Sequence, residues 1–428
     1  MSDPAAQGAV HGAIDAVWRI ESARLIARLA RMVGDVGLAE DLAQDALVVA
    51  LERWPESGVP DNPGAWLMAA AKRRAIDHLR RDRMLDRRHL EIARGSREDR
   101  ADPEAEILAA LVDPVGDELL GLIFTTCHPV LATEARVALT LRLLSGLTTE
   151  EIARAFLTST STIQQRIVRA KRTLREARIP IEPPPATDLP ARLQSVLEVV
   201  YLVFNEGYSA TAGADWLRPA LCEDALRLGR ILAGLMENEA EVHGLVALME
   251  IQASRLRART GPGGEPILLN DQDRSRWDWV LVQRGLAALD RAVSRGGLGP
   301  FALQAAIAAC HARARTPEET DWTRITALYD ALAQLTPSPV VELNRAVAYS
   351  MAFGPAAGLE IADPLLGEPM LAGYHLLPAV RADILAKLGR FAEAKTELER
   401  AAAMTENAKE RGLLLGRAAG MEKRMAGA

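Results

Sequence analysis

One stretch, residues 146–178, limits the fold of this 428-residue chain more than any other segment. It reads GLTTEEIARAFLTSTSTIQQRIVRAKRTLREAR and contains two short amphipathic patterns around a break. Thr148 and Glu151 have the spacing of a capping box, which indicates that a helix begins here. Ile152 and Phe156 are four residues apart, so they lie on one side of that helix. The first pattern therefore predicts a short helix with one buried face.

The second pattern predicts a helix with two different faces. It follows a break at residues 157–159, where Ser159 has the residue type of an N-cap. One face is an apolar stripe at helical spacing, formed by Ile163, Ile167, Ala170 and Leu174. The opposite face carries Thr162, Gln165, Arg166, Arg169 and Arg172. A short turn before such a helix suits a helix-turn-helix in the major groove of DNA, with base contacts near its N-terminus and arginines on phosphates. The alternative is a solvated basic helix.

Composition favours an all-α fold. Strand-like runs of Val, Ile, Thr and Tyr are nearly absent, and aromatic residues make up 4% of the chain, which argues against β-structure. The length allows two or three domains. The net charge of −6 excludes a uniformly basic nucleic-acid binder, so any contact with nucleic acid depends on local basic segments.

The cysteines predict neither disulfides nor a metal site. Cys127, Cys222 and Cys310 lie far apart without a CxxC motif, as is usual in the reducing cytoplasm. The adjacent Cys-His pairs at 127–128 and 310–311 would diverge on a helix, so we expect no metal and no cofactor. The first residues lack a signal-peptide pattern, and no apolar run reaches the ~18 residues of a membrane span. We therefore predict a cytoplasmic protein without a membrane segment.

Residues 10–83 predict a compact helical domain. We expect helices at 13–33, 39–54 and 64–83, with a turn-rich loop at 55–63. The second helix has an acidic outer face of Glu40, Asp41, Gln44, Asp45 and Glu52. Such a face is solvated surface or a docking site for a basic partner.

The third helix combines Trp66 with a dense basic run of Lys72, Arg73, Arg74, Arg80, Arg81 and Arg83. Aromatic and basic side chains together suit single-stranded bases and their backbone, although a charge run is also a common solvated surface. A charged linker at 84–117 follows, with a short helix near 105–112. Two helices within 118–145, broken at His128-Pro129, would brace the helix-turn-helix.

The order of these features resembles an extracytoplasmic-function (ECF) sigma factor. Residues 39–54 resemble region 2.2, which docks on the clamp coiled coil of the largest RNA polymerase subunit. Residues 65–83 resemble regions 2.3 and 2.4, which melt and read the −10 element. Residues 147–175 resemble region 4.2, which reads the −35 element. The resemblance covers residues 10–178, so sigma region 2 would span 10–83 and sigma region 4 would span 118–178.

The resemblance implies three sets of contact residues. Core RNA polymerase would be bound by Asp41, Gln44 and Asp45. The −10 DNA would be bound by Trp66, Lys72, Arg73, Arg74, Asp77 and Arg80. The −35 DNA would be bound by Ser161, Thr162, Gln164, Gln165, Arg166 and Arg169. Asp77 has an alternative role in a salt bridge within its helix, to Arg73 or Arg81. Two separate readers gain affinity when polymerase fixes their spacing, so we expect the free protein to bind promoter DNA weakly.

A proline-rich segment, 179–190, predicts a semi-rigid, non-helical linker to a C-terminal half. A helical block is expected at 191–299, with Val196, Val199, Val200 and Val203 buried. Within it, Asn205-Glu206-Gly207-Tyr208 predicts a helix end with Gly207 in the left-handed conformation. This polar cluster is more typical of capping than of a ligand site.

Residues 300–420 show helix pairs of about 34 residues, as in tetratricopeptide repeats. The clearest pair is 377–404, in which small and medium residues at helix-packing positions include Ala382, Leu385, Leu388, Gly389, Ala392, Ala394 and Ala402. A weaker pair is 341–365. The chain resembles the ECF subgroup with a C-terminal tetratricopeptide-like extension. This implies regulation in cis and a surface for an unknown protein or ligand.

We find no phosphate-binding glycine loop, metal spacing or nucleophile elbow, so an enzyme is not expected. The leading hypothesis is a promoter-specificity factor. The alternative is a helix-turn-helix repressor with a helical sensor domain, which would bind duplex DNA alone as a dimer and would leave the acidic helix and the Trp66 region without a role. A tetratricopeptide scaffold would leave the whole N-terminal half without one.

Overall fold

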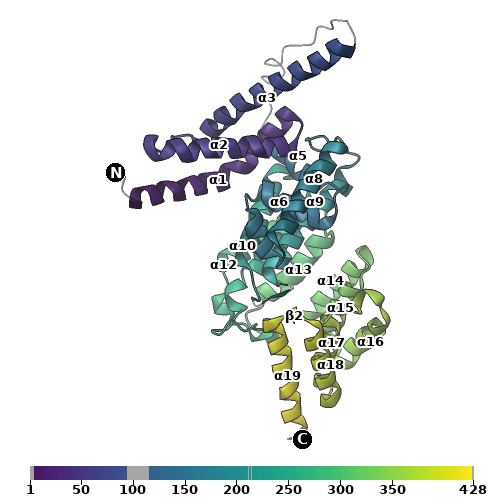
Figure 1. Ribbon diagram of the computed structural model, residues 1–428. Coiled ribbons are helices and arrows are strands. Elements are labelled where there is room, and N and C mark those ends of the chain that lie inside the picture. The colour runs from purple at the N-terminus through teal and green to yellow at the C-terminus, as the bar shows by residue number, and fades with distance from the viewer. Residues whose placement is uncertain (1–3, 94–114, 211, 214, 427–428) are drawn as a thin grey trace. The chain divides into compact units, whose positions relative to one another are not determined.

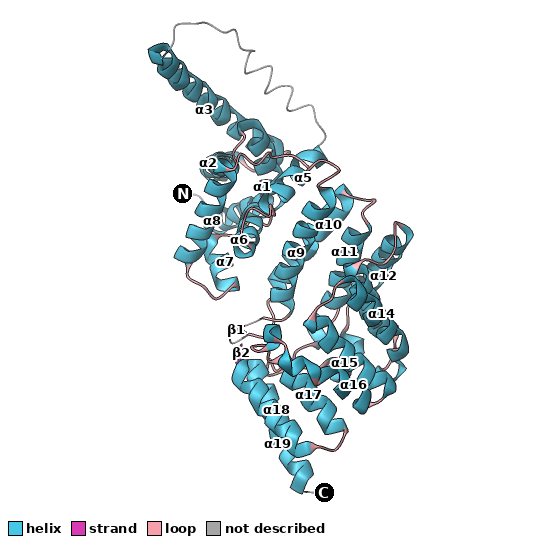
Figure 2. Cartoon of the chain, turned by 90° about the vertical axis from the view of Figure 1, so that its right-hand side faces the viewer, coloured by secondary structure: helices cyan, strands magenta, loops and turns pink. Residues whose placement is uncertain are grey.

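A computed structural model describes residues 4–93, 115–210, 212–213 and 215–426. Most of this backbone is helical, which confirms the predicted all-α fold (Figure 2). The chain divides into two compact units, Met1–Val199 and Val200–Ala428. Helix α9 (Leu189–Tyr208) begins in the first unit and ends in the second.

The first unit begins with α1 (Pro4–Val33), α2 (Val36–Ser57) and α3 (Pro63–Ala93) (Figure 1). Asp35 caps α2, because its Oδ1 accepts from Gly37 N at 2.6 Å and Leu38 N at 3.0 Å. The predicted start of a loop at residue 55 is wrong, since α2 continues through Pro55 and stops at Gly58, where φ is +80°. A proline this close to a helix end removes only one backbone donor. The helix predicted near 105–112 lies outside the described residues.

The first unit continues with α5 (Val115–Thr126), α6 (Thr133–Leu143), α7 (Thr149–Ala155) and α8 (Thr160–Glu176). The predicted break at His128-Pro129 is confirmed, because it lies between α5 and α6. The proline-rich segment is non-helical until α9 begins, and it packs along α5. A Cβ on Gly121 would lie 2.9 Å from the Glu182 Cα, so only glycine allows this approach.

The first turns of α9 complete the C-terminal end of α5. Arg192 Nη2 donates to the Phe124 carbonyl at 2.8 Å, and Ser195 Oγ donates to the Cys127 carbonyl at 2.6 Å. These bonds occupy carbonyls that have no partner within a helix. Residues 180–195 are therefore part of the first unit and not a free tether.

The second unit contains α10 (Pro219–Leu235), α11 (Ala240–Ala253), α12 (Trp279–Ser294) and α13 (Pro300–Arg313). All four valines predicted to be buried in α9 are buried. The helix end predicted at residues 205–208 is confirmed, since α9 stops at Tyr208. The left-handed conformation predicted for Gly207 is wrong, because Gly207 is still helical and has no positive φ. A Cβ there would lie 2.7 Å from Cys222 N. Glycine at this position allows α9 and α10 to approach closely.

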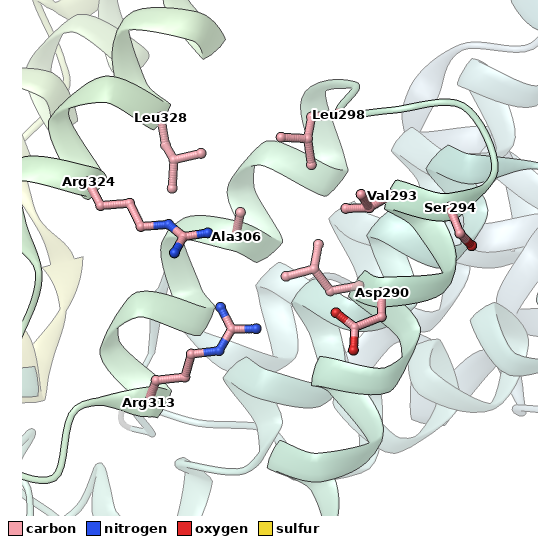
Figure 3. A pocket seen from close by; sticks show the side chains of 9 residues that line it. Asp290, Val293, Ser294, Leu298, Ala306, Arg313, Arg324 and Leu328 are labelled. Carbon is pink, nitrogen blue, oxygen red and sulfur yellow. The ribbon is translucent and has the colours of Figure 1, made fainter.

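A pocket of about 410 Å³ opens among α12, α13 and α14 (Trp322–Leu335). Its wall includes Leu289, Leu298 and Leu328. Figure 3 shows the guanidinium groups of Arg313 and Arg324 reaching toward the same opening.

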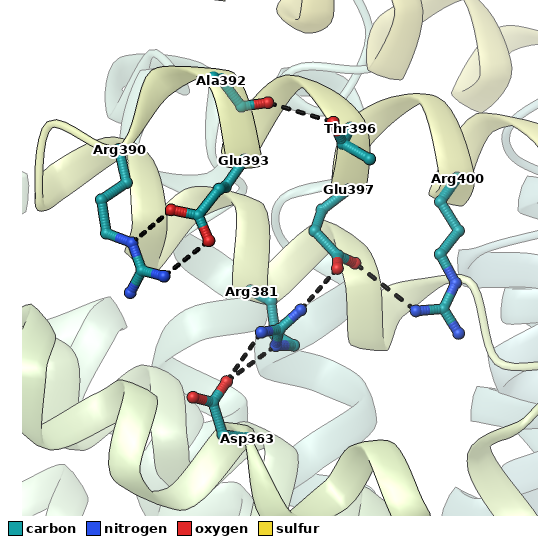
Figure 4. Close-up of polar contacts among 8 residues, drawn as sticks. All are labelled: Asp363, Arg381, Arg390, Ala392, Glu393, Thr396, Glu397 and Arg400. Carbon is teal, nitrogen blue, oxygen red and sulfur yellow. Dashed lines mark hydrogen bonds and ion pairs between the residues drawn. The ribbon is translucent and has the colours of Figure 1, made fainter.

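Helix pairs continue from α15 (Pro339–Phe353) and α16 (Pro355–Ala362) to α17 (Leu376–Lys387) and α18 (Phe391–Met404), followed by α19 (Ala408–Ala426). Arg381 of α17 pairs with Asp363 at 2.9 Å and with Glu397 of α18 at 2.5 Å (Figure 4). Of the seven positions predicted to pack between helices, Ala382, Leu385, Ala394 and Ala402 are buried, but Leu388, Gly389 and Ala392 are exposed. Leu388 lies in the turn between the helices, beyond their shared face.

Short 3₁₀ turns lie at Leu256–Ala258, Leu269–Asp271, Arg274–Arg276, Pro317–Glu319, Pro364–Gly367 and Pro369–Leu371. A two-residue parallel ladder joins β1 (Ala212–Gly213) to β2 (Glu406–Asn407). The buried Asn407 strengthens it, since its Nδ2 donates to the Ala210 carbonyl at 3.1 Å and the Asp215 carbonyl at 2.9 Å. These bonds attach the start of α19 to the loop after α9.

Candidate nucleic-acid and polymerase interface

The predicted helix-turn-helix is confirmed at α7 and α8. Thr148 Oγ1 accepts from Glu151 N at 3.1 Å, and Glu151 Oε2 accepts from Thr148 N at 2.8 Å, which completes the capping box. The turn contains Leu157 with φ of +47°. Ser159 then caps α8 by accepting from Thr162 N at 3.1 Å.

Helix α8 separates a buried stripe from a polar face. The apolar stripe is buried as predicted, at Ile163, Ile167, Ala170 and Leu174. The six candidate −35 residues all lie within Thr160–Glu176: Ser161, Gln164, Gln165 and Arg169 are exposed, and Thr162 and Arg166 are half-buried. Among the described side chains, no carboxylate pairs with Arg166 or Arg169. Both guanidinium groups are therefore available for an anionic partner.

Helix α2 presents the acidic residues proposed for polymerase. Asp41 and Asp45 are exposed, whereas Gln44 is half-buried and donates from Nε2 to Glu40 Oε1 at 2.7 Å. Burial raises the pKa of Asp41 above its usual value, and nearby Lys171 opposes that shift. Asp45 Oδ2 lies 2.5 Å from Arg74 Nη1 on α3.

The structure brings two of the predicted sets together in one pocket of about 330 Å³ between α2 and α3. It is lined by Leu38, Asp41, Leu42, Asp45, Arg74, Asp77 and His78. Arg74 and Asp77 of the −10 set therefore face the acidic residues of α2. The other −10 candidates divide into exposed Arg73 and Arg80 and half-buried Lys72 and Trp66. Trp66 packs edge-on against buried Trp54, with ring centres 5.3 Å apart.

An ion-pair cluster that sequence reasoning missed joins α2 to α6 and α8. Glu40, only 4% exposed, accepts from Arg142 Nε of α6 at 2.6 Å. Its Oε2 lies 2.5 Å from Lys171 Nζ of α8. We call these contacts the Glu40 bridge. The predicted acidic outer face of α2 is thus partly internal, because Glu40 lies against cations of the helix-turn-helix unit.

Three further pairs join α1 and α2 to the helices that follow α3. Asp35 pairs with Arg175 at the C-terminal end of α8. Although burial alone would raise it, the pKa of Asp35 is held below its usual value by Arg175 and the α2 amides. Arg28 Nε lies 3.0 Å from buried Glu118, and Arg19 lies 3.8 Å from Glu151. The two ion-pair partners of Glu40, Arg142 and Lys171, lie 102 residues or more away in the sequence, so no local pattern could reveal them.

Comparison with known proteins identifies the family. Residues 20–84 match Sigma-70 region 2, and residues 122–174 match Sigma-70, region 4. The ECF RNA polymerase sigma factor SigK of Mycobacterium bovis is 30% identical over 156 residues, which cover 36% of this chain and 78% of SigK. This chain belongs to the ECF sigma factors of the sigma-70 family. Sigma factors of this kind are initiation factors and not enzymes, and their partners are core RNA polymerase and promoter DNA.

Other relatives extend the comparison. The probable ECF sigma factor SigI of Mycobacterium tuberculosis is 31% identical over 180 residues, which cover 41% of this sigma factor and 59% of SigI. The uncharacterized protein R00370 of Rhizobium meliloti is 43% identical over 394 residues, which cover 89% of each chain. No solved structure matches. Residues 192–293 match a family of unknown function, DUF6596.

The described residues contain no helix long and apolar enough to cross a membrane. In the same part of the chain, no group of three or more His, Cys, Asp or Glu side chains is placed to hold a metal ion.

Proposed function

We propose that this sigma factor uses α2 to bind core RNA polymerase, α3 to bind −10 DNA and α8 to bind −35 DNA. The observation that carries the proposal is the division of α8 into a buried stripe and an open face, on which Arg166 and Arg169 form no ion pair with the part of the chain that the structure describes. Arginine and glutamine side chains near the start of a helix suit base edges and phosphates in the major groove. The match of residues 20–84 to Sigma-70 region 2 supports a role for the acidic helix and the Trp66 region, which the repressor alternative leaves without one.

We further propose that the described form is closed and must open at a promoter. Elements centred near −35 and −10 lie about 25 base pairs apart, which is about 85 Å at about 3.4 Å per base pair. Lys171 of α8 instead lies within 2.5 Å of Glu40 on α2. Simultaneous reading of both elements therefore requires the Glu40 bridge and the Asp35–Arg175 pair to separate.

We propose that the C-terminal half regulates the sigma-factor activity in cis, as a tetratricopeptide-like domain that binds a protein or a ligand. Its successive helix pairs, such as α15–α16 and α17–α18, support this proposal. A chain ending at Ser209 retains the whole of α9 and the bonds from Arg192 and Ser195 that complete α5. Comparing its transcription with that of the full chain gives the sign of the effect, provided that circular dichroism shows it to be folded.

The test of the sigma function uses the full chain, purified core RNA polymerase and fragmented genomic DNA, with sequencing of transcript 5′ ends. We expect discrete start sites that share −35 and −10 sequences and are absent without the protein. Arg169→Ala should reduce transcription about 5- to 150-fold, since one specific contact contributes about 1–3 kcal/mol. Arg154→Ala, an exposed arginine on α7, is the control. Unchanged output from Arg169→Ala would reject the assigned −35 face, and tight duplex binding without polymerase would favour the repressor alternative.

A further inference from the structure

Three arginines of the second unit are buried without an acidic partner. Arg255, Arg259 and Arg274 are 9%, 8% and 9% exposed. Among the described side chains, no carboxylate forms an ion pair with any of them. A buried charge is unfavourable unless it is paired. The nearby Glu250 follows the usual pattern, because it pairs with Arg230 at 2.8 Å.

Aromatic rings connect the three guanidinium groups into one cluster. The Arg259 guanidinium carbon lies 3.6 Å from the Tyr208 ring centre, and that of Arg255 lies 5.7 Å from the same ring. The Trp277 ring centre lies 5.9 Å from the Arg255 guanidinium carbon and 5.0 Å from that of Arg274. An aromatic face attracts positive charge, but it does not accept the hydrogen bonds that a guanidinium donates in its own plane.

The cluster contains several donors without acceptors. These buried atoms are Arg255 Nε, Arg274 Nε, Arg274 Nη2, Trp216 Nε1 and Trp277 Nε1. Trp216 belongs to the cluster because its ring centre lies 5.4 Å from the Arg259 guanidinium. Arg274 is held in place through Nη1, which donates to the carbonyls of His311 at 2.7 Å and Ala314 at 2.5 Å. One edge of its guanidinium is thus fixed while the rest lacks an acceptor.

Neighbouring groups supply only part of the missing negative charge. The exposed carboxylates Glu318 and Glu319 act on Arg274 without forming an ion pair with it, and burial together with Arg255 still outweighs them in lowering its pKa. His311 is 9% exposed, and burial, together with Arg255 and Arg274, lowers its pKa to about 4. It is therefore neutral near pH 7. Burial also lowers the pKa of Arg255 and of Arg274, which indicates an environment that disfavours the charged forms.

We propose that Arg255, Arg259 and Arg274, with the indole N–H groups of Trp216 and Trp277, form a binding site for a phosphate group. Guanidinium groups match tetrahedral oxyanions through paired N–H donors. Three positive charges suit a doubly charged phosphate better than a single carboxylate. The site lies within residues 192–293, the segment that matches a family of unknown function, and it uses free phosphate or a phosphate ester as ligand.

The pocket in Figure 3 is a weaker candidate. It also presents two arginines, Arg313 and Arg324, but both are exposed. Water solvates an exposed guanidinium, so these side chains do not require a ligand. The buried cluster differs because its charges and donors are removed from water.

The test uses the full-length protein and measures binding of inorganic phosphate by calorimetry, with thermal unfolding in phosphate and in chloride at matched ionic strength. Phosphate that binds only the folded state lowers the unfolding equilibrium constant about 20-fold at about twenty times Kd. We expect a saturable rise in Tm in the wild type. The same measurements with glycerol phosphate at equal concentration distinguish the two kinds of ligand. The compound that binds more tightly, the ester or free phosphate, is the one that the site prefers.

Arg255→Met retains the aliphatic stem and removes the charge, and Arg257→Met is the matched control because Arg257 is exposed two residues away. The phosphate response should be lost in the first variant and kept in the second. In chloride, Arg255→Met should unfold at the same or a higher temperature than the wild type, since an uncompensated buried charge has been removed. An equal phosphate response in both variants would show a general salt effect and overturn the proposal. So would the absence of saturable binding of either phosphate compound to the wild type, a result that requires no variant to fold.

Discussion

Glu40→Gln is the change that tests most directly whether the described form of region 2 and region 4 is held closed by charge. Glutamine has nearly the same shape as glutamate but lacks the charge that faces Arg142 and Lys171. Removing one partner from a fully buried pair costs about 3–5 kcal/mol. The side chains of Arg142 and Lys171 are 23% and 18% exposed, so water compensates part of the loss. We therefore expect the α2–α8 contact to weaken by about 1.5–3 kcal/mol.

A loss of this size should increase the ratio of open to closed molecules about 10- to 150-fold, because about 1.4 kcal/mol is a factor of ten. The distance between α2 and α8 can be measured by pulsed electron spin resonance in the full chain. Val48→Cys and Val168→Cys provide label sites on these helices, since the two side chains are 51% and 61% exposed. The native cysteines are buried, which limits labelling to the introduced positions.

We expect the labelled Glu40→Gln protein to gain a population at longer distance and to start transcription faster when sigma factor is limiting. Glu52→Gln is the matched control, because Glu52 lies exposed on the same helix. A distance distribution identical to that of the control would refute a role for the Glu40 bridge in closure. A longer distance without any gain in transcription would refute the proposed need for opening.

Three further predictions concern stability. In a denaturant titration, Gly207→Ala should lower the free energy of unfolding by about 1–3 kcal/mol through overpacking, because its Cβ would lie 2.7 Å from Cys222 N. Gly234→Ala in α10 is the control: its Cβ meets nothing within 4 Å, so this variant should be neutral or stabilising. Asn407→Ala should lower the free energy of unfolding by about 1–3 kcal/mol, because two buried carbonyls lose their hydrogen-bond donor. Asn344→Ala, at an exposed position, should lower it little, and equal losses in the two variants would contradict the role of the ladder. Burial, with a smaller effect of Arg192, lowers the pKa of His128 in the folded protein to about 4. As pH decreases, His128 therefore takes up a proton in the unfolded chain before it does so in the folded protein. The free energy of unfolding should fall as pH decreases from about 6.5 toward 4. His128→Asn should reduce that pH dependence, and an unchanged slope would assign it to other groups.

The parts of the site that could be predicted from sequence are those whose partners are close in the chain. Thr148 and Glu151 form their capping box within four residues, and the α8 stripe follows from helical periodicity alone. Local steric and hydrogen-bonding rules determine such features. The same rules do not determine whether a polar face stays exposed. Glu40 belongs to an acidic pattern typical of surface, yet it is buried by Arg142 and Lys171 from distant segments.

Gly207 shows a similar limit for backbone predictions. A glycine after Asn-Glu is typical of a helix end, but the same residue type is required where two helices approach closely. The second requirement decides the outcome here, because Cys222 of α10 occupies the space that a Cβ would need. Local sequence alone contains no information about that neighbour.

The buried arginines are the strongest case of this limit and also the most informative about function. Arg255, Arg257 and Arg259 alternate within one short segment, and all three would be assigned to the surface by residue type. Tyr208 and Trp277, which come from other segments, enclose Arg255, while Tyr208 and Trp216 enclose Arg259. Arg257 remains exposed. Burying two like charges without an acid opposes folding, so stability alone does not account for arginine at these positions. A ligand that supplies the negative charge does account for it, since departures from local consistency concentrate at functional sites.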